Sequence, residues 1–142
     1  MKSHTLEQLH AIAEVDTVCP TMTRNQRLER WASLLERHPE RRLGALPGTE
    51  YMSPDMRENA YCVQSPISVA FEDPILRAQG LEGDTYGEAK RFFELSNWQL
   101  HNIVCDCHVG ATMKAGWVAV RVRAAMGEGF NIFARLRALL GR

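Results

Sequence analysis

Residues 113–126 read Met-Lys-Ala-Gly-Trp-Val-Ala-Val-Arg-Val-Arg-Ala-Ala-Met, and this stretch decides the fold class. Valine alternates with other residues over 118–123, and a period of two is typical of a β-strand. A helical stripe of apolar side chains also runs through the stretch, at Met113, Trp117, Val120 and Ala124. The alanines favour a helix through their intrinsic propensity. We therefore interpret residues 113–126 as a helix, apolar nearly all round and buried in the centre of the domain.

Signals for helix starts lie on both sides of this stretch. A Gln or Glu three residues further on follows Thr5, Thr23 and Thr85. A proline directly follows Ser53 and Asp73, and Ser96 precedes residues 97–108. These are N-cap and capping-box patterns, in which a side-chain oxygen accepts a free backbone N–H. The clearest helix follows Thr23, with an apolar stripe at Leu28, Trp31, Ala32 and Leu35. Residues 39–52 are rich in proline and glycine and are interpreted as a loop.

These patterns predict a mainly α fold. We expect a compact bundle of five to seven short helices, with a single helical domain over residues 1–126. Gly127 and Gly129 predict a break, so residues 127–142 are interpreted as a Gly-hinged C-terminal amphipathic helix. The alternative is an α+β fold, in which residues 67–71 and 117–123 pair as a small two-stranded sheet.

Composition narrows the class of protein. A chain of 142 residues with 45% hydrophobic and 24% charged residues fits one globular domain. Lys+Arg and Asp+Glu are both 17, so a nucleic-acid partner is not expected. No run approaches the roughly 18 apolar residues that span a bilayer, and no secretory signal is visible. We therefore expect a cytoplasmic protein with reduced cysteines and no membrane partner.

The balanced charge conceals a gradient along the chain. Residues 43–95 carry an excess of acids, whereas residues 112–142 carry Lys114 and five arginines against Glu128 alone. Either the acidic middle and the basic end pair within one fold, or the basic end meets an acidic partner.

One stretch suggests metal or thiol chemistry, Leu100-His101-Asn102-Ile103-Val104-Cys105-Asp106-Cys107-His108. In an unbroken helix, Cys107 joins the apolar stripe, whereas His101, Cys105 and His108 share the adjacent edge. Imidazole and thiolate are ligands that zinc prefers, so zinc or iron is the candidate metal, with Cys62 as a further ligand. Alternatively, the helix ends at Val104 and Cys105, Cys107 and His108 wrap a metal from a loop.

The simpler interpretation is that these cysteines are structural thiols. A single Cys-x-Cys-His lacks the second paired motif of zinc fingers and ribbons. Free cysteine is among the most buried residue types and behaves as a small hydrophobe. On this interpretation no cofactor is expected.

The C-terminal helix is a candidate binding element. Its apolar arc includes Phe133, Leu136 and Leu140, and Arg135 and Arg137 flank it. Such an arc either packs on its own domain or binds a partner, as a helix does in a groove.

No phosphate-binding loop, dinucleotide-binding glycine triplet or nucleophile elbow is present in the sequence. The sequence therefore favours a small cytoplasmic, non-enzymatic protein-interaction or regulatory module, with a protein partner or self-association. The alternative is a metal-binding or thiol-based sensor that uses His101, Cys105, Cys107 and His108.

Overall fold

The computed structural model describes residues 20–106 and 110–140, with side chains as far as Gly127. The elements run in the order α2 (Arg24–Glu36), β1 (Arg42–Gly44), β2 (Leu46–Pro47), the 3-10 helix η1 (Thr49–Tyr51), α3 (Pro54–Glu58), α4 (Pro66–Phe71), α5 (Pro74–Ala78), α6 (Tyr86–Phe92), α7 (Asn97–Val104), β3 (Cys105–Asp106), β4 (Thr112–Lys114) and α8 (Ala115–Leu140). These described residues therefore form seven α-helices and four very short strands. The predicted mainly α fold is confirmed.

The predicted N-caps within the described residues are confirmed. The side chains of Thr23, Ser53, Asp73, Thr85 and Ser96 each accept a hydrogen bond from the backbone of the helix that follows. Ser65 caps α4 in the same way, with Pro66 at the first helical position, and this signal was missed. The pattern at Thr5 lies outside the described residues.

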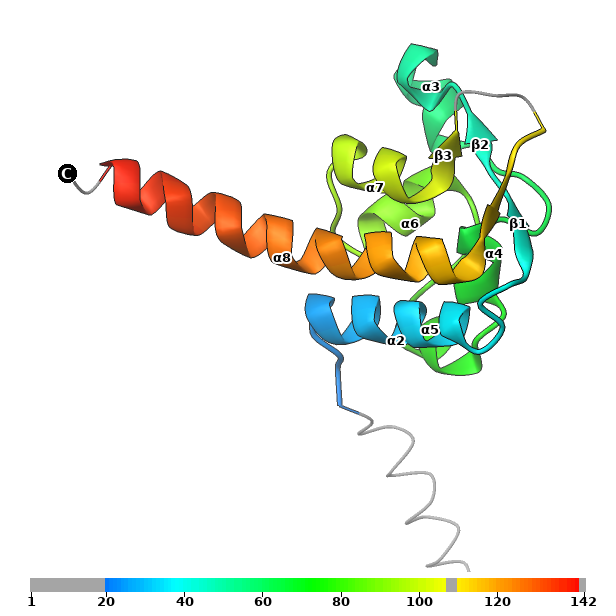
Figure 1. Ribbon diagram of the computed structural model, residues 1–142, viewed down its shortest axis with the longest axis horizontal. Coiled ribbons are helices and arrows are strands. Elements are labelled where there is room, and N and C mark those ends of the chain that lie inside the picture. The colour runs from blue at the N-terminus through cyan, green and yellow to red at the C-terminus, as the bar shows by residue number, and fades with distance from the viewer. Residues whose placement is uncertain (1–19, 107–109, 141–142) are drawn as a thin grey trace, which may run out of the picture.

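The antiparallel pair α2 and α8 forms one side of the domain, and the shorter helices pack around it (Figure 1). Helix α2 buries the predicted stripe, Leu28, Trp31, Ala32 and Leu35. Helix α8 buries Ala115, Val118, Ala119, Val122 and Ala125, which we call its inner face.

The predicted buried stripe of α8 is wrong. Trp117 is 65% exposed and Val120 64% exposed, and Ala124 is exposed beside them. The small residues of the inner face let α8 approach α2 closely, and an indole in that position would hold the helices apart. Trp117 therefore faces away from α2, on what we call the outer face: Trp117, Val120, Ala124 and Gly127.

The sheet of the α+β alternative is also wrong. Residues 67–71 lie in α4 and residues 117–123 lie in α8. The observed sheets instead pair β1 with β4 in antiparallel register, Leu43 opposite Met113, and β2 with β3 in parallel register, Leu46 opposite Cys105. The strands β1 and β2 lie within the predicted 39–52 loop. Each is at most three residues long, too short to show the alternation that marks a strand.

Aromatic side chains fill the core between α2 and α6. Trp31 stacks on Phe93 with ring centroids 4.4 Å apart, and Phe92 meets Phe93 edge to face at 4.9 Å. The indole N–H of Trp31 donates to the carbonyl of Pro66 over 2.9 Å, so the buried polar atom is satisfied. Arg30 makes a two-pronged ion pair with Asp73 at 3.0 and 2.9 Å. These contacts attach α2 to α4, α5 and α6.

Two described basic residues of the C-terminal part, Lys114 and Arg123, form ion pairs with acids that lie before the acidic middle. Arg123 binds both Glu29 and Glu36 on α2, and Lys114 lies 3.1 Å from Glu40. These acids precede residues 43–95. The side chains of Arg135, Arg137 and Arg142 lie outside the described part of the chain.

Helix α8 is continuous through Gly127 and Gly129, so the interruption predicted there does not occur in the backbone. Its second half extends beyond the other elements (Figure 1). The division of the chain into two domains at residue 127 stays a prediction.

Candidate functional site

The cysteine–histidine stretch does not form one helical edge. Ser96 and Gln99 form the capping box that begins α7, and the helix ends at Val104. Cys105 is already extended, with φ −105° and ψ 148°, because β3 pairs with β2. The alternative prediction, in which the helix ends at Val104, is therefore confirmed for the position of the helix end. Cys107 and His108 lie outside the described residues, so their part in a metal site stays a prediction.

Thr49 connects His101 and Cys105, the two predicted site residues of the cysteine–histidine stretch that are described. Its Oγ1 lies 2.7 Å from Sγ of Cys105 and 3.3 Å from Nδ1 of His101. Sequence analysis missed Thr49, because η1 lies in the predicted loop and is far from α7 along the chain.

The thiol of Cys105 is buried. Cys105 is only 8% exposed, and burial raises the pKa of its thiol. Since the thiolate is the reactive form of cysteine, this burial disfavours reaction of Cys105 as a nucleophile.

His101 lies at the surface edge of this cluster. Its Nδ1 is 3.2 Å from Oε2 of Glu50, and its ring stacks on Trp98 at 5.9 Å between centroids. With a proton on Nδ1, the imidazole donates a hydrogen bond to the Glu50 carboxylate. Trp98 itself is 68% exposed, so a flat aromatic surface faces solvent here.

His101 lines two pockets. The first, of about 500 Å³, is lined by Thr49, Glu50, Arg57, Tyr86, Asn97, Trp98 and His101. Its polar groups are already engaged: Tyr86 donates to the Asn97 carbonyl at 2.9 Å, and Arg57 donates to the carbonyls of Thr49 and Met52. Burial raises the pKa of Tyr86 to about 12, so the phenol stays neutral.

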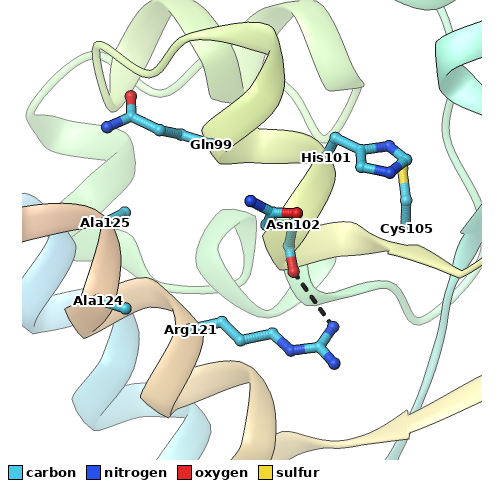
Figure 2. A pocket seen from close by; sticks show the side chains of 7 residues that line it. All are labelled: Gln99, His101, Asn102, Cys105, Arg121, Ala124 and Ala125. Atoms are coloured by element: carbon cyan, nitrogen blue, oxygen red, sulfur yellow. Dashed lines mark hydrogen bonds between the residues drawn. The ribbon is translucent and has the colours of Figure 1, made fainter. Parts of the chain in front are cut away.

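The second pocket, of about 370 Å³, lies between α7 and α8 and is lined by Gln99, His101, Asn102, Cys105, Arg121, Ala124 and Ala125 (Figure 2). Arg121 donates to the carbonyl of Asn102 over 3.1 Å. This contact ties α8 to the end of α7.

Cys62 is a partly buried thiol. Its Sγ lies 3.5 Å from the carbonyl oxygen of Val63, and burial raises the pKa of this thiol as well. Within residues 20–106 and 110–140, no three histidine, cysteine, aspartate or glutamate side chains come together as a metal site requires. The described part of the chain thus offers no cluster to which Cys62 could contribute.

The predicted partner-binding residues, Phe133, Arg135, Leu136, Arg137 and Leu140, all belong to the second half of α8. Their side chains lie outside the described ones, so their role stays a prediction. Apolar exposure that sequence analysis did not foresee lies on the first half, at Trp117 and Val120.

None of the known protein families, curated proteins or solved structures compared with the chain matches it. No helix within the described ranges is long and apolar enough to cross a membrane.

Proposed function

We propose that the protein is a small, non-enzymatic interaction module that binds a second copy of itself through the outer face of α8. The observation that carries the proposal is the exposure of Trp117 and Val120, one helical turn apart on the solvent side of a 26-residue helix. Large aromatic side chains are enriched at protein interfaces, where they bury much area with little loss of conformational freedom.

An antiparallel second copy is the arrangement that we propose for the outer face. The first half of this face carries Trp117 and Val120, and by helical rotation the same face continues through Asn131, Arg135 and Ala138. With the pair centred near residue 126, Trp117 of one copy lies opposite position 135 of the other. That position carries an arginine, whose cation is attracted to an indole face.

A thiol or metal sensor has less support from the geometry. Cys105 is buried with a raised pKa, and the described residues bring together no metal-binding group. An enzymatic role also has little support. The hydroxyl of Thr49 and Nδ1 of His101 lie 3.3 Å apart, but Thr49 is only 1% exposed and its hydroxyl lies 2.7 Å from Sγ of Cys105.

Analytical ultracentrifugation tests the proposal. Wild-type protein is expected to pass from monomer to dimer between about 1 and 100 µM, the range of weak homodimers. The double variant Trp117→Ala, Val120→Asp is expected to stay monomeric with an unchanged melting temperature. Trp98→Ala is the matched control, because it removes an equally exposed tryptophan from α7. The proposal would be contradicted if the wild type stays monomeric over this range. It would also be contradicted if Trp98→Ala weakens dimerisation as much as the double variant does.

A further inference from the structure

The inner face of α8 continues past the point where α2 covers it. At 100° per residue, Phe133, Leu136 and Leu140 fall on the same side of the helix as Val118, Val122 and Ala125. Helix α2 begins at Arg24, whose Nη2 lies 3.5 Å from the carbonyl oxygen of Ala125. The inner face therefore loses its α2 cover next to Ala125, while the helix runs on to Leu140.

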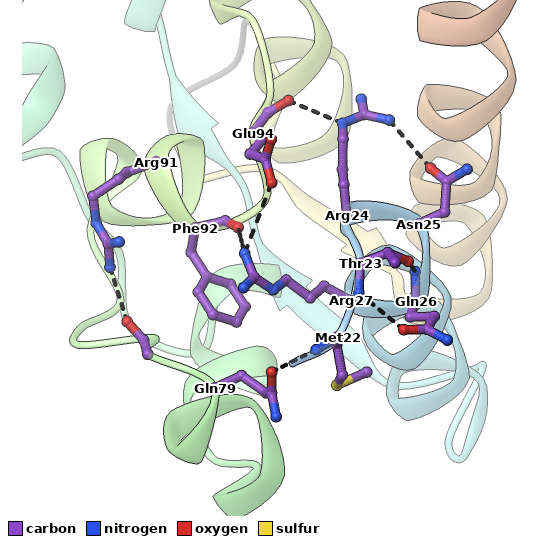
Figure 3. A network of polar contacts seen from close by, with 11 residues as sticks. Met22, Thr23, Arg24, Asn25, Gln26, Arg27, Gln79, Arg91, Phe92 and Glu94 are labelled. Atoms are coloured by element: carbon purple, nitrogen blue, oxygen red, sulfur yellow. Dashed lines mark hydrogen bonds and ion pairs between the residues drawn. The ribbon is translucent and has the colours of Figure 1, made fainter. Parts of the chain in front are cut away.

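The chain also enters α2 at this point. The carbonyl of Pro20 accepts a hydrogen bond from Gln79 over 3.1 Å, and the N–H of Met22 donates to Gln79 over 2.8 Å. Arg24 and Arg27 then bind the carbonyls of Glu94 and Phe92, which hold the start of α2 in place (Figure 3). Because α2 and α8 run in opposite directions, the segment preceding α2 starts from the edge where the second half of α8 becomes uncovered (Figure 1).

We propose that residues 5–18 form an amphipathic helix that packs, within the same chain, on the inner face of the second half of α8. Length fits, because residues 5–18 and 127–140 would each span about 21 Å as a helix. The pattern fits over the first three turns: Thr5 and Gln8 form a capping-box pattern, followed by an apolar stripe at Leu6, Leu9, Ile12 and Ala13. Asp16 lies on the same side one turn further on and ends the stripe. Pro20 separates this helix from α2, as a proline does at a helix boundary.

Charge favours the same pairing. Residues 1–19 carry Glu7, Glu14 and Asp16 against the single base Lys2, whereas residues 127–142 carry three arginines against Glu128. Segments of opposite net charge attract each other when their apolar faces meet. The proposal concerns the inner face only, so it is independent of self-association through the outer face.

Hydrogen exchange of the backbone amides tests this packing in the full-length chain. The measurement is made in the Trp117→Ala, Val120→Asp background, so that contacts through the outer face do not contribute. Amides 129–140 are expected to exchange slowly, to the same extent at about 5 and 100 µM protein. Leu9→Asp is expected to speed their exchange by about 10-fold or more, since it places a charge in the apolar contact.

Ala11→Asp is the matched control, because it adds the same charge on the opposite side of the proposed N-terminal helix. It is expected to leave the exchange of amides 129–140 unchanged. The proposal would be overturned if amides 129–140 exchange rapidly while Leu9 is still present. It would also be overturned if Leu9→Asp leaves their exchange rate unchanged. Protection that grows with protein concentration would also overturn it, because the inner face would then be covered by a second copy.

Discussion

The Sγ atom of Cys105 lies 2.7 Å from Oγ1 of Thr49, and both side chains are buried. The contact joins the end of α7 to η1 and, together with Nδ1 of His101, gives the buried Thr49 hydroxyl its hydrogen-bond partners. A thiol held in this way contributes to packing and polar satisfaction.

We predict that Cys105 reacts slowly with thiol reagents in the folded protein. Burial raises the pKa of its thiol, so the reactive thiolate is scarcer at every pH below that value than in an exposed cysteine. Residue-resolved mass spectrometry of alkylated protein should show modification at Cys105 at least about 10-fold slower than in denaturant. Rapid labelling of the native protein at neutral pH would contradict the structural role.

The ion pair between Arg30 and Asp73 is predicted to be the most costly described polar contact to break. Asp73 is buried, pairs with Arg30 and caps α5. Asp73→Ala should lower the free energy of unfolding by about 3 kcal/mol, because Arg30 and the helix cap both lose their partner. Urea unfolding measures this loss, and a change smaller than that of an ordinary surface variant would contradict the prediction.

The contribution of Asp73 should depend on pH. Burial alone would raise the pKa of Asp73, but hydrogen bonds from Arg30 and the Leu76 N–H lower it below the ordinary 3.8. A carboxyl whose pKa is lower in the folded than in the unfolded state stabilises the fold at pH values above its unfolded-state pKa. This stabilisation is lost as the pH falls through the folded-state pKa. The stability difference between wild type and Asp73→Asn should therefore be full at neutral pH and shrink below about pH 4. A constant difference would show that the charge of Asp73 has no part in it.

The ion pairs of Arg123 with Glu29 and Glu36 should contribute less to stability than the Arg30–Asp73 pair, although they join α2 to α8. All three side chains are substantially exposed, so solvent screens their attraction. Arg123→Ala should cost much less stability than Asp73→Ala. The small loss should vanish in about 1 M salt, where the Debye length is roughly 3 Å. Thermal melts at low and high salt measure it, and a salt-independent loss would indicate packing instead of charge.

Gly44 in β1 is predicted to reject a side chain. A Cβ atom there would lie 2.5 Å from Sγ of Cys62 and 2.9 Å from the carbonyl oxygen of Val63. Gly44→Ala should destabilise the protein by about 1–3 kcal/mol, as overpacking does. Adding Cys62→Ala should recover only part of the loss, since the Val63 carbonyl stays. A double-mutant cycle measures this coupling, and full additivity of the two changes would contradict it.

Local signals carried the sequence-based predictions that succeeded. The caps at Thr23 and Ser96 are decided by side chains within three residues, and they are in place. The α2 stripe was also correct, because Leu28 and Trp31 stand on a helix with one plainly apolar side.

The predictions that failed depended on partners distant in the chain. Helix α8 has apolar residues on two faces, and only the close approach of α2 decides that Val118 turns inward and Trp117 outward. In the same way, α7 ends at Val104 because Cys105 pairs with Leu46 of β2, a strand too short to be visible in the sequence. Thr49 was missed as a site residue for the same reason.

The continuity of α8 has a consequence for how the chain tolerates changes in length. A straight helix turns by 100° and rises about 1.5 Å with each residue, so an insertion near Gly127 rotates everything beyond it around the axis. One added residue would swing Phe133 and Leu140 a quarter-turn or more away from the line of Val122. Seven added residues would nearly restore their direction and move them outward by about 10 Å. The number of residues between Ala125 and Leu140 therefore determines the direction of the apolar face as much as the identity of the residues does.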